Sequence, residues 1–145
     1  MHPFYREFEL VKPVSDFFIK KGYTIFREIR IGFCRADIVA IKDNLVTAIE
    51  LKLSDRKKAV IQAKNYQYGA DFVYLAFPLL KIHAILRTSE HLLKKEGIGL
   101  LSIHEEECSV TEIIKAKRSA KKFASLTINE ITQKKNHSHS KKRRY

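Results

Sequence analysis

The chain has 145 residues, of which 45% are hydrophobic, and its nine Phe and six Tyr are enough for the core of one compact domain. No stretch approaches the roughly 20 consecutive apolar residues of a membrane span, and the first residues lack a signal-peptide pattern. Cys34 and Cys108 have no zinc-like spacing, so two buried free thiols are expected in place of a disulfide or a zinc site. These features argue against a membrane protein and a disulfide scaffold, and they predict a soluble, cytoplasmic protein.

The net charge of +12 is concentrated at the C-terminal end of the sequence. Residues 1–114 carry 17 Lys and Arg against 15 Asp and Glu, whereas residues 115–145 carry 11 Lys and Arg against Glu130 alone. A strongly basic segment attracts polyanions, of which nucleic acid is the most common in a cell. The charge therefore favours a nucleic-acid partner, with a solubilising tail or an acidic protein partner as alternatives.

The first half of the chain predicts one helix followed by three strands. Apolar residues recur at helical spacing over residues 4–21, and alternation predicts a strand over residues 23–31. Residues 35–42 and 45–53 are rich in β-branched side chains and flank Asp43 and Asn44, which favour a tight hairpin turn. A helix and a three-stranded meander are therefore expected before residue 54.

The second half predicts alternating helices and strands. Helical spacing over residues 55–68 precedes a near-continuous apolar run over residues 71–78, which is typical of a strand buried on both faces. A short strand over residues 82–86, a short helix over 89–95 and a last strand over 98–104 follow. The expected fold class is α/β, with a mixed central sheet flanked by helices and the core order αβββαβ.

Three segments of the chain differ in composition. Residues 1–110 carry the apolar periodicity and form the expected globular domain. Residues 111–131 place Ile113 and Ile114 beside several lysines and arginines, which predicts a basic helix. Residues 132–145 are mostly Lys, Asn, His, Ser and Arg, so a basic tail without stable structure is expected there.

Three charged side chains stand inside otherwise apolar strands. Burying a charge in a sheet costs several kcal/mol per ion unless something compensates it. Alternation along a strand puts Glu50 and Lys52 on one face, and pairing across the hairpin brings Asp37 beside them. An ion pair on a solvated face is the plain structural alternative, but the apolar flanks favour a functional site.

Two carboxylates that converge on one point repel each other unless a cation lies between them. Hard oxygen ligands without Cys or His nearby favour Mg²⁺, with Mn²⁺ as the alternative. A lysine beside them would stabilise the negative charge that develops on a phosphate during hydrolysis. Asp37, Glu50 and the backbone carbonyl of Leu51 are therefore candidate metal ligands, and Lys52 is a candidate catalytic residue for phosphodiester hydrolysis.

The pattern Asp37…Glu50-x-Lys52 on successive strands, after an N-terminal helix, resembles the PD-(D/E)XK nuclease superfamily, which includes restriction endonucleases, archaeal Holliday-junction resolvases and RecB-type nuclease domains. The resemblance covers about residues 4–104, and Ala36 stands in place of the proline that names the motif. It implies a restriction-endonuclease-like fold and a Mg²⁺-dependent endo- or exonuclease of DNA repair, recombination or restriction. Because several such enzymes are dimers, a homodimer is also to be considered.

Gln62 and Tyr66 are similar in spacing to the Gln-x-x-x-Tyr motif of the RecB-like branch. In that branch the two residues contact substrate or brace the metal ligands. The resemblance therefore adds Gln62 to the candidate catalytic residues and Tyr66 to the candidate nucleic-acid contacts. A glutamate of the first helix often completes such sites, and Glu9 is the best-placed match, with Glu7 and Glu28 as alternatives.

Basic residues in two regions are expected to contact the phosphate backbone. The sequence thus predicts a Mg²⁺-dependent nuclease that acts on DNA, with RNA left open. A non-catalytic nucleic-acid-binding module of the same fold and a protein-interaction subunit with a basic tail are the alternatives. The expected contacts are Lys57, Lys58 and Lys64 beside the helix over residues 55–68, and Lys117, Arg118, Lys121 and Lys122 in the basic segment.

Overall fold

The structure is a computed structural model that describes residues 3–123. Its centre is one six-stranded mixed sheet in which the strands stand in the order β1-β2-β3-β4-β5-β6, the same order as in the chain. The strands are β1 (Thr24–Ile31), β2 (Cys34–Lys42), β3 (Leu45–Leu51), β4 (Phe72–Pro78), β5 (Gly99–Ile103) and β6 (Val110–Ile114), and the helices are the 3₁₀ helix η1 (Glu7–Leu10), α1 (Val11–Ile19), α2 (Arg56–Tyr66) and α3 (Leu79–Glu96).

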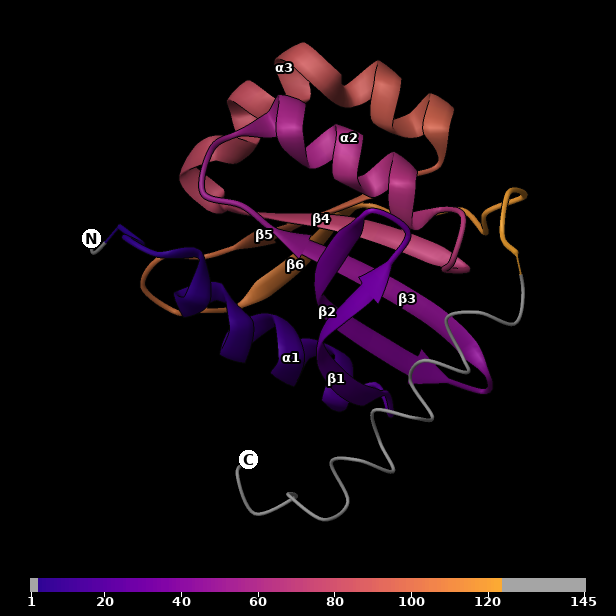
Figure 1. Cartoon of the computed structure of the whole chain (residues 1–145). Coiled ribbons are helices and arrows are strands. Elements are labelled where there is room, and N and C mark those ends of the chain that lie inside the picture. Colours follow the sequence, from indigo (N-terminus) through magenta and orange to yellow (C-terminus); the bar gives the residue numbers. More distant parts are fainter. Residues whose placement is uncertain (1–2, 124–145) are drawn as a thin grey trace.

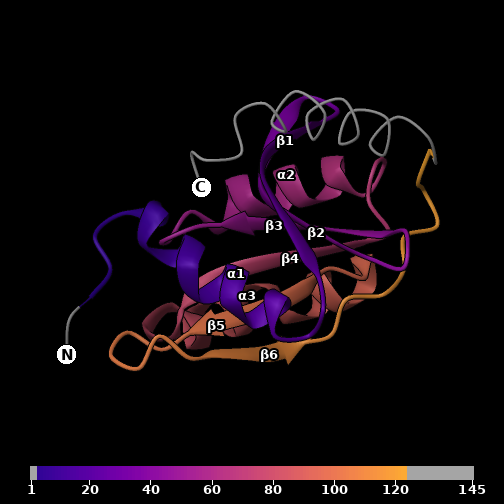
Figure 2. The ribbon, with the colours of Figure 1, turned by 90° about the horizontal axis from the view of Figure 1, so that it is seen from below.

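Helices cover both faces of the sheet (Figure 1). On one face η1 and α1 pack with Leu10, Val14 and Phe18 against β2, β3 and β5. On the other face α2 and α3 build the larger core, in which Ala63 and Leu93 are fully buried. The view from below places α1 on the near side of the sheet and α2 and α3 behind it (Figure 2). The molecule is therefore a three-layer α/β sandwich, as the alternating elements predicted.

The strand directions bring one set of chain ends together. Strands β1, β2 and β3 form an antiparallel meander, β3, β4 and β5 run parallel, and β6 is antiparallel to β5. Parallel neighbours need a crossover, and here α2 and α3 provide the two crossovers. The carboxyl ends of β3, β4 and β5 therefore share one edge of the sheet with the amino ends of α2 and α3.

One stretch of the second half differs from the sequence prediction. The strand expected over residues 82–86 and the short helix over 89–95 are wrong, because a single helix, α3, spans both. Its buried side chains recur every three or four residues. The β-branched residues near Ile82 have a high strand propensity, but in the structure they pack as one face of an amphipathic helix. The helix ends at Gly97, whose φ of 74° is favourable for glycine.

The basic helix predicted over residues 111–131 is also wrong where the structure describes it. Residues 110–114 form the edge strand β6, and residues 115–123 continue without helix. Their backbone hydrogen bonds reach distant parts of the chain, with the Ser119 amide donating to the Asp71 carbonyl and the Phe123 amide to the Tyr68 carbonyl. Tertiary partners therefore replace the local i→i+4 bonds of a helix. The rest of that prediction and the tail over residues 132–145 lie outside the described residues.

The cysteine prediction is half right. Both thiols are free, but Cys34 is only partly buried and Cys108 is exposed, so the expectation of two buried thiols is wrong. Among residues 3–123, none of the helices has the length and apolar character needed to cross a membrane.

Candidate active site

Asp37, Glu50 and Lys52 meet where β2 and β3 lie side by side. Ile38 of β2 pairs with Ile49 of β3, so the next residues along, Asp37 and Glu50, come at the same level of the two strands, and the charge of Asp37 acts on Glu50. The exposed fractions of Glu50 and Lys52 are only 3% and 6%, and their charged groups form an ion pair of 3.4 Å. The structure thus brings the three charged residues of the sequence pattern into one cluster, in which Glu50 and Lys52 are buried and Asp37 is partly buried.

The alternation of β3 decides which face of the sheet Glu50 occupies. Ile49 and Leu51 belong to the core under α1, and Ala48 belongs to the core under α2 and α3. Glu50 therefore points toward α2, where the Tyr66 hydroxyl lies 2.5 Å from its carboxylate. The same hydroxyl lies 3.0 Å from the Arg35 carbonyl. Its single proton is within reach of both acceptors, so Tyr66 joins the first hairpin to Glu50.

Asp37 is fixed through both its side chain and its backbone. Its carboxylate accepts a hydrogen bond of 2.8 Å from the Leu51 amide. Its carbonyl accepts one of 3.0 Å from the Arg27 guanidinium on β1. These bonds hold the Asp37 carboxylate against the end of β3, beside the residues that follow it in the chain.

The surroundings of the cluster shift the pKa values of two side chains, Glu50 and its partner Tyr66. Burial, and then the negative charge of Asp37, raise the pKa of Glu50 from 4.5 to about 7, although Tyr66 and Lys52 act in the opposite direction. Burial and the neighbouring Glu50 also raise the pKa of the Tyr66 hydroxyl far above its usual range. When both carboxyl groups are ionised, the cluster carries two negative charges, and Lys52 balances only one of them.

The donor set fits a divalent cation that prefers oxygen. A cation between Asp37 and Glu50 would remove the repulsion that raises the Glu50 pKa. The side-chain oxygen of Gln62, one helical turn before Tyr66 on α2, is buried without a hydrogen-bond partner in the described structure. Among residues 3–123 no three His, Cys, Asp or Glu side chains gather in one place. Mg²⁺, which keeps several waters and takes one or two carboxylates, suits such a sparse set.

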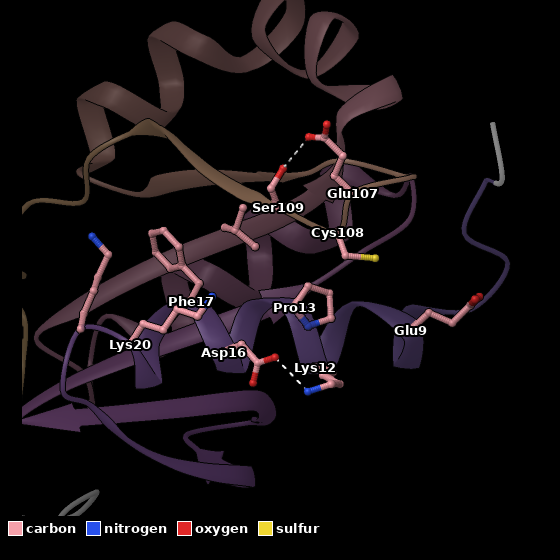
Figure 3. A pocket seen from close by; sticks show the side chains of 11 residues that line it. Glu9, Lys12, Pro13, Asp16, Phe17, Lys20, Glu107, Cys108 and Ser109 are labelled. Carbon is pink, nitrogen blue, oxygen red and sulfur yellow. Dashed lines mark hydrogen bonds and ion pairs between the residues drawn. The ribbon is translucent and has the colours of Figure 1, made fainter.

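The structure does not bring Glu9 to this cluster. The Glu9 carboxylate is exposed and accepts hydrogen bonds of 2.8 and 2.9 Å from the Tyr5 and Arg6 amides, which lower its pKa. It closes a capping box at the start of η1, and it lines an open pocket between α1 and residues 107–110 (Figure 3). Helix capping therefore explains the acidic residue that the resemblance offered as a metal ligand.

The two alternatives to Glu9 lie in different places. Glu7 is exposed on the same 3₁₀ helix. Glu28 stands on β1 between the pairs Arg27–Ile38 and Ile29–Ala36, opposite Asp37, with a φ of 55°. Of the three glutamates, Glu28 has the backbone position nearest to Asp37.

The basic residues of α2 lie in its first and last turns. Asp55 caps the helix by accepting from the Lys58 amide at 3.1 Å, directly after the strand that carries Glu50. Lys57 and Lys58 are exposed on the first turn, at the same edge of the sheet as the carboxyl end of β3. Lys64 is exposed near the other end of α2, with its ammonium 4.0 Å from the Glu96 carboxylate.

The basic residues of the C-terminal segment have other partners, which the sequence analysis missed. Lys122 and Arg118 form ion pairs of 2.8 and 3.5 Å with Asp71, which is 1% exposed at the amino end of β4. Lys121 lies 3.7 Å from Glu96, and Lys117 is exposed beside Gly97. These residues sit at the edge of the sheet opposite to the Glu50 cluster. A signal was present, since Asp71 is an acidic residue at the start of a fully apolar run.

Tyr66 also corrects a sequence prediction. Its side chain has no exposed surface, so it supports Glu50 from the core and is not a contact for nucleic acid in this structure.

Comparison with known protein families and with curated proteins finds no match. Solved structures that share the fold include the following three. SPO1766, a protein of unknown function from Silicibacter pomeroyi, has a TM-score of 0.63 and 18% identity over 92% of this chain and 85% of its own. An XisH family protein from Nostoc punctiforme has a TM-score of 0.55 and 21% identity over 74% of this chain and 97% of its own.

The third structure is an fdxN element excision controlling factor from Anabaena variabilis, with a TM-score of 0.53 and 21% identity over 72% of this chain and 97% of its own. At these identities the likeness concerns the fold alone. The predicted fold class, a restriction-endonuclease-like mixed sheet flanked by helices, is confirmed.

Proposed function

We propose that this chain is a metal-dependent nuclease that hydrolyses phosphodiester bonds in DNA. The observation that carries the proposal is the cluster of Asp37, Glu50 and Lys52, in which the buried Glu50 lies between a second, partly buried carboxyl group and a single buried ammonium. A protein gains no stability from such a cluster that a well-packed apolar one would not provide. Its cost is therefore explained best by chemistry.

Asp37, Glu50 and the Leu51 carbonyl would hold Mg²⁺ or Mn²⁺, and Gln62 would offer its unpartnered oxygen to a water of the ion. When bound, the ion polarises a phosphate oxygen and makes water more acidic. The oxygen-only donor set at the end of β3 supports this assignment, because these are the ligands that hard cations prefer.

The residues of the chain have separate tasks in the reaction. Water adds to phosphorus, one P–O bond breaks, and the departing oxygen takes up a proton. Lys52 would stabilise the negative charge that grows on the phosphate, since its ammonium is desolvated and held by Glu50. Tyr66 would keep the Glu50 carboxylate in place through its hydroxyl. Asp37 is positioned in the same way by the Leu51 amide.

DNA is the phosphodiester that the remaining features favour. The net charge of +12 and the exposed Lys57 and Lys58, on the first turn of the helix that follows β3, suit a polyanion. One structural neighbour is named an element excision controlling factor, which agrees with a role on DNA. The carboxyl edge of β3, β4 and β5, with the amino ends of α2 and α3, would receive the backbone.

The test is cleavage of a labelled panel of linear duplex, single strand, flap and four-way junction in Mg²⁺, Mn²⁺ or EDTA. We expect metal-dependent cutting that falls at least about a hundredfold in Lys52→Met and Asp37→Asn. Lys95→Met, an exposed lysine in the last turn of α3 and away from this edge, is the matched control and should cut normally. Tight binding without cutting in any metal would identify a binding module instead, and absence of binding would favour a protein partner.

A further inference from the structure

The turn between β1 and β2 carries the most exposed large apolar side chain of residues 3–123. Phe33 is 91% exposed, although phenylalanine normally gains about 1.5–3 kcal/mol from burial. A hairpin tip that only needed to be soluble would carry a polar residue there, as turns usually do. The position therefore suits a side chain that is covered by a partner.

The tip is held in one conformation. Gly32 adopts a φ of 63°, and a Cβ at this position would collide with the Asn65 side chain. Asn65 on α2 donates to the Ile31 carbonyl at 2.6 Å and accepts from the Phe33 amide at 3.1 Å. In Figure 1 the turn accordingly lies beside the end of α2. The exposed ring is thus carried on a fixed support, which lowers the entropy lost when a partner binds.

Two arginines stand just before and just after the turn that carries the ring. Arg30 and Arg35 are direct partners across β1 and β2, and both are exposed. Like charges directly opposite each other on a sheet are destabilising. Such a pair is favourable when an anion lies against it, and guanidinium groups match phosphate geometry well. The tip therefore presents an aromatic ring on the turn and, just below it on the hairpin, a pair of phosphate-binding groups.

The tip is connected to the catalytic cluster by a change of face within the hairpin. Ala36 belongs to the core under α2, whereas Ile38, two residues later, belongs to the core under α1. The same change occurs on β1 at Glu28, opposite Asp37. It bends the tip over α2, where the Tyr66 hydroxyl reaches both the Arg35 carbonyl and the Glu50 carboxylate. The Tyr66 side chain therefore connects the hairpin that would hold a partner with the Glu50 carboxylate.

We propose that this hairpin tip is a base-stacking platform that selects DNA with unpaired bases, with Phe33 stacked on a base and Arg30 and Arg35 on the flanking phosphates. The inference rests on the proposed nuclease function and narrows its substrate to single-stranded, bulged or branched DNA. An aromatic side chain stacks on any unpaired base, whereas a fully paired duplex keeps its bases covered. The arginines would add affinity that falls as salt rises.

The chain contains no tryptophan, which permits a direct probe of stacking. Full-length Phe33→Trp is titrated in EDTA with a single strand, a bulged duplex and a fully paired duplex, and the emission of the introduced indole is followed. We expect strong quenching by the single strand and the bulge and little by the paired duplex. The control is Ile19→Trp, which places the indole at a 52% exposed position on α1, across the sheet.

Affinity completes the test. Phe33→Ala should bind the single strand about tenfold more weakly at physiological salt while its affinity for paired duplex stays within about twofold. Phe33→Leu should resemble Phe33→Ala, because it keeps the apolar surface but not the ring. Unchanged affinity, equal loss for paired and unpaired DNA, or quenching equal to that of Ile19→Trp would each overturn the inference.

The outcome is separable from that of the nuclease proposal. If no DNA is cut but Phe33-dependent binding of unpaired DNA is found, only the catalytic proposal fails. If DNA is cut and Phe33→Ala binds and cuts every substrate like the wild type, only the platform fails.

Discussion

Glu50 is the residue whose protonation connects the cluster to the stability of the fold. In the unfolded chain its pKa is the ordinary 4.5, and in the folded protein it is about 7. Between these values the folded state holds more protons than the unfolded state, so the free energy of unfolding falls as pH rises. The contribution of Glu50 is therefore complete below pH 4.5 and is lost as the pH rises through about 7.

This predicts a pH-dependent stability that a single substitution removes. In EDTA, we expect the free energy of unfolding to fall by about 2–3 kcal/mol more between pH 5 and pH 8 in the wild type than in Glu50→Gln. Urea denaturation at four pH values measures both curves. Parallel curves for the two proteins would contradict the raised pKa. Added Mg²⁺ should stabilise the wild type most at high pH, where the cation need not displace a proton from Glu50.

The sequence was sufficient to predict which charged residues of the site come together. It predicted only part of what the residues around them do. The spacing of Asp37, Glu50 and Lys52 with strand alternation gave their common location. The role of Tyr66 as the partner of Glu50 agrees with one of the two roles the resemblance offered. Glu9 lies in the capping box of η1, and sequence cannot separate this use from metal binding, because a glutamate three residues into a helix suits both.

At the scale of elements, α2 is the part that organises the first hairpin. It carries Tyr66 toward Glu50, and it carries Asn65 into the turn of β1 and β2. One side chain, Asn65, therefore provides both a donor and an acceptor to a turn more than thirty residues earlier in the chain.

We expect Asn65→Ala to lower the free energy of unfolding by about 1–2 kcal/mol, because the Ile31 carbonyl and the Phe33 amide lose their partner. Chemical denaturation measures the change. The neighbouring Lys64→Ala, at an exposed position, is the control and should stay within about 0.5 kcal/mol of the wild type. A loss no larger than that of the control would show that the turn holds its shape without α2.

Elements were predicted best where periodicity was local. The meander of β1, β2 and β3, the helix α2 and the buried strand β4 follow their apolar patterns. The prediction divided α3 into a strand and a short helix, because the β-branched side chains of its first half favour a strand locally. Packing against the sheet is what stabilises the whole segment as a helix. The edge strand β6 was missed because its strand conformation depends on pairing with β5, and the composition of residues 110–114 does not reveal that pairing.

At the scale of the whole molecule, the C-terminal segment is tied to the domain through Asp71. This carboxylate accepts from the Val46 amide at 2.7 Å and also pairs with Lys122 and Arg118. Residues 115–123 are thus held at the amino edge of the sheet, and the ring of Phe123 stacks on Tyr68. Residues 115–123, the described part of the basic segment, therefore pack against the domain and stabilise the fold.

We expect Asp71→Asn to destabilise the protein by about 2–3 kcal/mol, because it leaves the mostly buried Lys122 without its anion. Limited proteolysis should then cut within residues 115–123 earlier than in the wild type. Asp16→Asn, which breaks an exposed pair with Lys12, is the matched control and should cost less than about 0.5 kcal/mol. Equal stability of the two variants would refute the role of Asp71.

The strand order of the sheet has a consequence for how the protein is made. Because each strand pairs only with the strands next to it in the chain, loop closures are short and folding can follow synthesis from the N-terminus. Every residue from Asp37 to Tyr66 has emerged from the ribosome before β4 begins. The later strands are added to an edge of the sheet that already holds the candidate site, so insertions among these strands do not separate the residues of that site.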